Sequence, residues 1–227
     1  MAAQCVMPFA LRPAADRGRL VDAGVSGVAA FSHGSAFDRH WLGFRGLRVL
    51  NRVDLAPGAR LPAARRANME VLTLVLAGTY RCVSQAGDSG PVTAGQWHRL
   101  GAGVGVDVVE ENAAADATLR LLQLWVQPTH SNASPVQAIG TPGIGESLIA
   151  APGPNGTSTG EANLDRTLLP WRSAASVRRE SIVPGGTLTV PATRGSACWI
   201  EVIGGELAYR GSGDAGVTFL RGGDGLG

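Results

Sequence analysis

The sequence predicts an all-β protein that contains two related barrels, and three observations support this prediction. Among the 227 residues, 32 glycines and 13 prolines separate short apolar runs of strand length. No long amphipathic helical pattern interrupts these runs. The layout of the first half also recurs weakly in the second half. Each half has a Pro-Gly approach, at Pro57 and Pro184, and a hairpin that opens on a glycine, at Gly78 and Gly205.

The expected strands are rich in aliphatic and aromatic residues and end at turn-forming residues. They are residues 46–53, 70–78, 79–85, 118–126, 178–184, 186–191 and 197–211. In the run 118–126, the odd-numbered side chains Leu119, Leu121, Gln123 and Trp125 face one way and the even-numbered side chains face the other. Because both faces are largely apolar, we expect this strand to lie inside a sandwich or barrel.

A change in composition divides the chain near its middle. Residues 127–145 are rich in Pro, Gly, Ser and Asn, as expected of a connection between domains. We therefore expect an N-terminal domain at residues 1–130, a linker at 131–144 and a C-terminal domain at 145–227. The chain stops in a glycine-rich segment where another strand is expected, so we expect the second barrel to be trimmed.

Charge and cysteine content argue against several function classes. The 20 cationic residues are all arginines, balanced by 18 acidic residues, and they are scattered, so no direct nucleic-acid binding is expected. No apolar run reaches about 18 residues, so no membrane span is expected. Cys5, Cys82 and Cys198 form neither a disulfide framework nor a zinc pattern, and the N-terminus is a poor signal peptide. A cytoplasmic location is therefore expected.

Two catalytic motifs are weakly represented. The run GAGVG at residues 101–105 resembles a dinucleotide-binding loop, but a strand-like segment follows it, so we interpret it as a turn between strands. The histidines are His33, His40, His98 and His130, and none of them follows a hydrolase serine elbow. We expect His33 and His130 to be exposed in loops. His98 lies on a short strand, where a histidine is more often structural than catalytic.

Residues 44–128 carry four landmarks: LRVLN from Leu47, ARRANMEV from Ala64, LGAGVGVDVVEEN from Leu100 and LQLW from Leu122. Together they resemble the N-terminal cupin domain of the pirin family, where these places read LRVIN, HPHRDMEI, MSAGTGI with HSE, and LQIW. Residues 146–164 and 199–225 resemble the second pirin domain only loosely. The resemblance implies two cupin-type β-barrels of the RmlC-like jelly-roll form.

The resemblance also implies one iron-like metal in the N-terminal barrel, held by three histidines and a glutamate. Carried over residue by residue, the histidine positions are Ala64, Arg66 and Val108, and only Glu110 keeps its ligand. Alanine and valine offer no donor atom, and arginine is a permanent cation that repels a divalent metal. We therefore expect neither this metal nor another cofactor.

A buried Glu110 without a counter-ion would be unfavourable, so our hypothesis is that Arg66 pairs with Glu110 inside the barrel. The alternative is that Arg66 extends to the barrel mouth and into water. Glu70 and His98 are expected to add to the polar lining. The candidate binding residues are thus Ala64, Arg66, Glu70, His98, Val108 and Glu110, and the candidate catalytic residues are Glu110 and His98.

Three functions remain open at this point. The favoured one is a metal-free pirin-like protein that binds a small organic ligand, with acid–base chemistry if it is an enzyme. The second is a metal-dependent dioxygenase that acts on a flavonol such as quercetin. The third is a non-catalytic regulator that binds a partner protein. A barrel filled by side chains such as Arg66 and Trp97 favours a partner protein, whereas an open barrel favours a small molecule.

Overall fold

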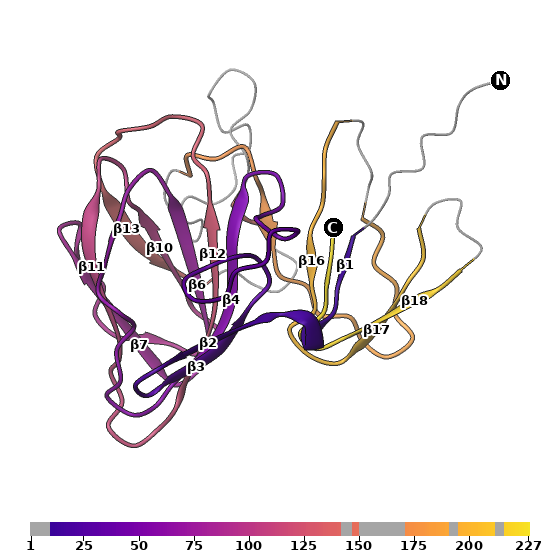
Figure 1. Cartoon of the computed structure of the whole chain (residues 1–227), viewed down its shortest axis with the longest axis horizontal. Coiled ribbons are helices and arrows are strands. Elements are labelled where there is room, and N and C mark those ends of the chain that lie inside the picture. Colours follow the sequence, from indigo (N-terminus) through magenta and orange to yellow (C-terminus); the bar gives the residue numbers. More distant parts are fainter. Residues whose placement is uncertain (1–9, 142–146, 150–170, 191–194, 212–215) are drawn as a thin grey trace.

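The computed structural model describes residues 10–141, 147–149, 171–190, 195–211 and 216–227. Within these ranges the regular elements are strands β1 to β19 and one short 3-10 turn, η1 (Ala14–Asp16), so the all-β prediction is confirmed. Figure 1 shows a barrel of long strands beside a smaller group of strands that includes the C-terminus. None of the described segments is a helix long and apolar enough to cross a membrane.

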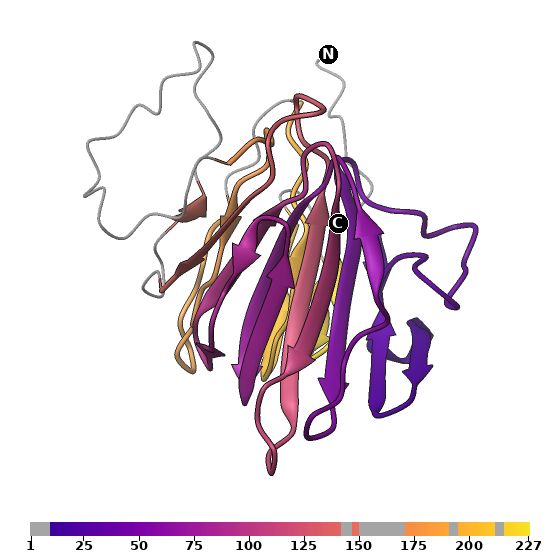
Figure 2. The same cartoon turned by 90° about the vertical axis from the view of Figure 1, so that its left-hand side faces the viewer.

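The barrel is built from two antiparallel sheets. The larger sheet has the strand order β13 (Val136–Gly140), β10 (Trp97–Gly101), β6 (Glu70–Ala77), β12 (Leu119–Val126), β4 (Leu47–Leu55), β3 (Val25–Ala29) and β2 (Gly18–Asp22). The smaller sheet has the order β5 (Ala64–Arg66), β11 (Val106–Asn112), β7 (Thr79–Ser84) and β8 (Gly87–Asp88), with β9 (Val92–Thr93) also paired to β7. Figure 2 shows the long strands of the barrel running alongside one another, with the yellow C-terminal strands behind them.

Period-two alternation decides which side chains fill the barrel. In β12, Leu119 and Leu121 belong to the cluster that forms the barrel interior. The even-numbered Leu122 and Val126 belong to a second cluster, which also contains Trp171 from the second half of the chain. The outer face of the larger sheet is therefore covered by the second half, and the expected burial of both faces of residues 118–126 is confirmed.

The described strands of the second half, β14 to β19, form three small sheets, and β1 joins one of them. They are β1 (Leu11–Arg12) with β19 (Gly225–Leu226) and β16 (Ile200–Glu201), β14 (Ser147–Ile149) with β15 (Val177–Arg178), and β17 (Glu206–Tyr209) with β18 (Thr218–Arg221). Because β1 pairs with β19, residues from near the start of the chain lie beside its end (Figure 1). A buried ion pair joins the same regions, since Arg17 donates to both oxygens of Glu201 at 2.8 and 2.7 Å.

The second half differs from its expected strands. Of the strand expected at 178–184, only Arg178 lies in a strand, and residues 186–190 form none. Residues 183–190 are all exposed, and no described strand pairs with them. Apolar alternation alone does not form a strand where no hydrogen-bonded neighbour is available.

The expected linker at 131–144 contains β13, which pairs with β10 at the edge of the larger sheet. The first domain expected at 1–130 also contains β1, which pairs with the C-terminal β19. The domain boundaries themselves stay predictions. Most of the second-half landmark at 146–164, and Cys5, lie outside the described residues.

The GAGVG run, residues 101–105, joins the end of β10 to β11 and is a turn between strands, as interpreted. Gly103 has a φ of 47°, and a Cβ atom at this position would overlap the backbone carbonyl of Ala133. Glycine is therefore needed to let the turn approach that neighbouring segment. Because strand β11 follows the turn, the dinucleotide-binding interpretation fails.

Candidate functional site

Strands β5 and β11 carry the four positions that the pirin resemblance singles out. Ala64 lies opposite Val108, and Arg66 lies opposite Val106, in an antiparallel register. Residues two apart on a strand share a face, so Ala64, Arg66, Val108 and Glu110 all face the same way. Val108 belongs to the interior cluster, so this shared face is the inner face of the barrel.

An ion pair joins Arg66 to Glu110 at these positions. Arg66 Nη2 donates to Glu110 Oε2, and the two residues are only 6% and 2% exposed. The guanidinium carbon of Arg66 also lies 4.6 Å from the ring centre of Trp125, a cation–π geometry. The hypothesis that Arg66 pairs with Glu110 inside the barrel is confirmed, and the alternative that Arg66 extends into water is wrong.

Two further donors complete the surroundings of the Glu110 carboxylate. The Tyr80 hydroxyl and the Gln123 side-chain amide both donate to Oε1, at 2.6 and 2.8 Å. Gln123 is itself held, because it donates to Thr73 Oγ1 at 3.1 Å and accepts from Trp125 Nε1 at 2.8 Å. Three donors therefore fix one carboxylate in the barrel interior.

These contacts set the charge state of the pair. Burial raises the pKa of the Glu110 carboxyl, but the Arg66 charge and the hydrogen bonds from Arg66 and Tyr80 outweigh burial, so the pKa lies below its ordinary value. Burial lowers the pKa of Arg66, and Glu110 more than compensates, so this pKa lies above its ordinary value. The site therefore holds an ionised pair at neutral pH.

A Tyr80→Phe variant tests the support given to Glu110. Removing the hydroxyl leaves one lone pair of a buried carboxylate unsatisfied, so the free energy of unfolding is expected to fall by about 1–3 kcal/mol. Urea unfolding of the variant and the wild type at neutral pH measures the difference. An unchanged midpoint would mean that the Tyr80 hydroxyl contributes nothing to holding Glu110.

The larger sheet contributes a row of polar side chains, of which His98 alone was expected to line the barrel. His98, Thr73, Gln123 and Asn51 occupy directly paired positions on the adjacent strands β10, β6, β12 and β4. All four are at most 3% exposed. Each is a polar residue among apolar residues that face inward on its strand, and this local signal was available in the sequence. Only the strand register shows that the four form one row.

His33 stands at the end of this row and was expected to be exposed. Instead it is half-buried, its ring lies 5.0 Å from that of Trp125 in an edge-on arrangement, and its Nδ1 lies 2.7 Å from Asn51 Nδ2. Burial and the nearby Arg66 charge lower the pKa of His33, so it is neutral at pH 7. The expectation for His33 is wrong, whereas His130 is exposed as expected.

His98 lies in the barrel interior as expected of a lining residue. It is 1% exposed, its Nε2 lies 3.1 Å from Gln137 Oε1, and its ring lies 5.5 Å from that of Tyr80. Burial lowers its pKa, and the bond to Gln137 only partly opposes that shift. The imidazole is therefore neutral and held by one defined partner.

Glu70 and Trp97 do not join this site. On β6 the residues Leu72 and Leu74 belong to the outer cluster, as does Trp97 on β10, so the even-numbered positions of β6 face away from the interior. Glu70 shares their face and pairs with buried Arg99, with contacts of 2.5 and 2.8 Å. The expectation that Glu70 lines the barrel is therefore wrong. The tryptophan that stacks against Arg66 inside the barrel is Trp125, not Trp97.

The site makes stability fall in acid. Glu110 has a depressed pKa, so its contribution is present above its ordinary pKa of 4.5 and is lost as the pH falls through the folded-state value. His98 also has a depressed pKa, so below about 6.5 the unfolded chain binds a proton that the folded chain does not. Both effects have the same sign.

We therefore expect the urea midpoint to fall between about pH 7 and about pH 4. A His98→Gln variant keeps a polar side chain without a titrating ring, so its midpoint is expected to fall less between about pH 6.5 and about pH 5. If the urea midpoint of the variant and that of the wild type fell equally with pH in that interval, His98 would not contribute to the loss of stability in acid.

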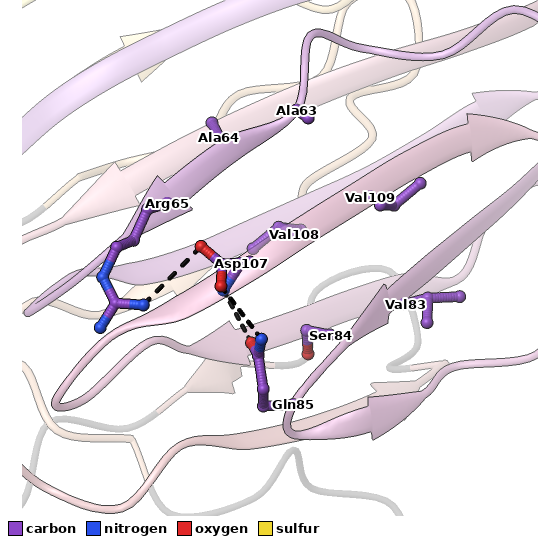
Figure 3. A pocket seen from close by; sticks show the side chains of 9 residues that line it. All are labelled: Ala63, Ala64, Arg65, Val83, Ser84, Gln85, Asp107, Val108 and Val109. Carbon is purple, nitrogen blue, oxygen red and sulfur yellow. Dashed lines mark hydrogen bonds and ion pairs between the residues drawn. The ribbon is translucent and has the colours of Figure 1, made fainter.

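A groove of about 550 Å³ lies outside this site, over the smaller sheet. Figure 3 shows its lining, in which Asp107 interacts with both Arg65 and Gln85 on one side, while Val83 and Val109 stand on the other. Ala64 and Val108 also border it. The buried Arg66–Glu110 pair does not line this groove, so the groove is a separate surface feature.

The donor atoms at the four pirin positions do not fit a metal ion. Glu110 is the one side chain there with a metal-binding oxygen, and both its oxygens already accept hydrogen bonds. Across the described ranges, no group of three or more His, Cys, Asp or Glu side chains is placed to hold a metal ion. An iron-like ion needs several such donors converging at about 2 Å.

Comparisons with known proteins identify the family. The family model described as Pirin matches residues 14–126. A putative quercetin 2,3-dioxygenase of Mycobacterium bovis is 30% identical over 184 residues, which are 80% of this chain and 73% of that protein. This chain belongs to the pirin family. The quercetin 2,3-dioxygenase of Escherichia coli K12 is 30% identical over 125 residues, 55% of this chain and 54% of the relative, so the pirin chain matches about half the length of that relative.

Solved structures agree on the fold. The crystal structure of YhhW from Escherichia coli superimposes with a TM-score of 0.70 at 22% identity, covering 96% of this chain and 88% of that one. A second structure describes the same protein as a bacterial pirin in complex with nickel(II), with a TM-score of 0.70. The match extends over both halves of the chain, which confirms the predicted fold class of two cupin-type domains.

Proposed function

We propose that this pirin works without the family's metal and binds a small organic ligand in its N-terminal barrel. One observation carries the proposal: the Arg66 guanidinium forms an ion pair with Glu110. The pair lies on the inner face where the pirin resemblance places a metal. A guanidinium gives a buried carboxylate the compensating positive charge that a metal ion would otherwise give. The barrel can therefore stay folded around Glu110 with no metal bound.

The geometry favours binding over acid–base catalysis. Glu110 accepts three hydrogen bonds and has a depressed pKa, so at neutral pH it neither donates a proton nor offers a free oxygen as a base. Arg66 differs, because its Nε and Nη1 have no hydrogen-bond partner among the described residues. A ligand acceptor would satisfy these buried N–H groups.

Relatives named quercetin 2,3-dioxygenase suggest a second function, a metal-dependent dioxygenase. That chemistry needs a redox-active metal held by imidazole and carboxylate ligands. Ala64, Arg66 and Val108 supply none of them. We therefore place this function second, and oxygen uptake with added quercetin tests it directly.

A third function, binding of a partner protein in the cytoplasm, has two observations in its favour. The groove over the smaller sheet exposes Val83 and Val109, each at 38%. Arg66 and Trp125 also occupy part of the barrel, which leaves less room for a small molecule. Two half-exposed valines make a small patch, so this function also ranks below ligand binding.

A metabolite screen by thermal shift on the full chain tests the proposal. We expect at least one organic compound to raise the melting temperature of the wild type and to have no such effect on an Arg66→Met variant. An Arg65→Met variant is the matched control, because Arg65 is exposed and pairs with Asp107 outside the barrel. A screen without any hit that depends on Arg66 would contradict ligand binding at this site.

A further inference from the structure

We propose that the ligand of the N-terminal barrel is a small neutral molecule of the amide type, with a carbonyl oxygen for Arg66 and an N–H group for Asn51. The inference rests on the function proposed above and names the chemistry of its ligand.

The first support is a set of buried polar atoms around Glu110. Within the described part of the chain, six side-chain atoms are buried without a hydrogen-bond partner. Four of them lie inside the barrel, namely Arg66 Nε and Nη1, Asn51 Oδ1 and His98 Nδ1, while Arg17 Nε and Arg99 Nη1 lie elsewhere. Asn51 is only 3% exposed and Arg66 only 6%. Buried polar groups in folded proteins almost always have a partner. Such a set on the facing inner sides of one barrel indicates a place for a polar ligand.

The second support is that a chain of contacts links Asn51 to Arg66, since Asn51 contacts His33, His33 contacts Trp125 and Trp125 lies against Arg66. Asn51 lies directly opposite Gln123 in the strand register, and Gln123 is bonded to both Glu110 and Trp125. Arg66 reaches the same two residues from the facing sheet, through its ion pair with Glu110 and its stacking on Trp125. We therefore place the ligand beside Trp125, between these two polar side chains.

Charge selects a neutral ligand. Arg66 and Glu110 form a buried ion pair, so their charges cancel inside the barrel. An ionised ligand would bring an unbalanced charge into a nearly dry interior, which is strongly unfavourable.

Hydrogen-bond complementarity selects the amide class. The N–H groups of Arg66 need an acceptor. Asn51 Nδ2 lies 2.7 Å from His33 Nδ1, and Asn51 Oδ1 needs a donor. An amide offers both groups without charge, on an oxygen and a nitrogen bonded to the same carbon, whereas a carboxylate of the same shape offers acceptors alone. An amide is also planar, which suits the face of Trp125 beside the guanidinium.

We place the entry of the ligand at His33 and Trp125. His33 and Trp125 are each partly exposed, while Asn51 and Gln123 behind them are buried. His33 comes from the loop between β3 and β4 and is held there by its contacts with Asn51 and Trp125. A ligand that entered here would meet Trp125 first and the unpartnered atoms next.

Matched amides and carboxylates test the inference. Crystals of the full chain are soaked separately with acetamide, benzamide, acetate and benzoate, and binding in solution is measured by calorimetry. We expect an amide with its oxygen on Arg66 and its nitrogen on Asn51 Oδ1, and no carboxylate at that place. We also expect an Asn51→Leu variant to lose at least about tenfold in amide affinity. An Arg48→Met variant on the same strand, whose side chain pairs with exposed Gln127, should bind amide normally.

Each other outcome overturns the inference in a distinguishable way. A carboxylate bound at Arg66 would overturn the choice of a neutral amide and leave ligand binding in the barrel intact. No amide at this place, or amide binding that is unchanged by Asn51→Leu, would overturn the assigned contacts. The comparison of amide binding with carboxylate binding uses the wild-type protein alone. It therefore still tests the inference if the Asn51→Leu variant fails to fold. The proposed function fails separately, if no hit in the metabolite screen depends on Arg66.

Discussion

Replacing Arg66 by methionine is expected to lower the free energy of unfolding by about 3–5 kcal/mol at neutral pH. Methionine has a similar length and removes the charge, so it leaves Glu110 ionised and uncompensated in the barrel interior. The carboxylate then either remains charged at that cost or takes up a proton. The loss is therefore expected to be smaller in mild acid. Urea unfolding at about pH 7 and about pH 5 measures both values.

Two further variants separate the ion pair from general effects of the substitution. Arg65→Met changes the neighbouring residue, whose side chain is 62% exposed and lies 3.7 Å from Asp107, so a loss of no more than about 1 kcal/mol is expected. The double variant Arg66→Met with Glu110→Gln removes both charges and is expected to recover much of the stability lost by Arg66→Met alone. If Arg66→Met were no more harmful than Arg65→Met, the pair would not stabilise the barrel.

Returning three histidines to the barrel is expected to create a metal site. The triple variant Ala64→His, Arg66→His and Val108→His places three imidazoles beside Glu110 on the inner face shared by β5 and β11. Three imidazoles and one carboxylate suit divalent transition metals. We expect the triple variant to bind about one Ni²⁺ per chain and to melt at a higher temperature when Ni²⁺ is added. Calorimetry and thermal unfolding, with and without Ni²⁺, measure these effects.

The single variant Arg66→His is the matched control for the triple variant. It provides one imidazole and one carboxylate, which are too few to hold the ion tightly, so no comparable gain in affinity is expected. If the triple variant folded and still failed to bind Ni²⁺, the inner face of β5 and β11 would not be the frame of a pirin metal site.

The fold was predictable where local patterns coincide with tertiary contacts. The alternation in residues 118–126 predicted burial on both faces, and β12 is in fact covered by the barrel interior on one face and by the second half on the other. The run 186–190 shows the limit of such patterns. Its composition suits a strand, but no described strand pairs with it, and pairing between distant segments is not written in the local sequence.

The site was predictable only in part for a similar reason. The pairing of Arg66 with Glu110 followed from two positions that the family resemblance brings together and from the cost of an unpaired buried carboxylate. Asn51 was missed because its role depends on the register that places it beside Gln123. Glu70 was misplaced because it is retained in the family-like run ARRANMEV, whereas strand parity turns it away from the interior.

The metal content of the purified protein tests the central claim most directly. The full chain is produced in medium supplemented with iron, nickel, manganese and copper, and the bound metals are measured by elemental mass spectrometry. The account predicts well below about one-tenth of an equivalent of any of these metals per chain, because the Arg66–Glu110 pair lies on the inner face where the pirin resemblance places the metal. Close to one equivalent of iron, nickel, manganese or copper, lost together with activity on chelation, would contradict it.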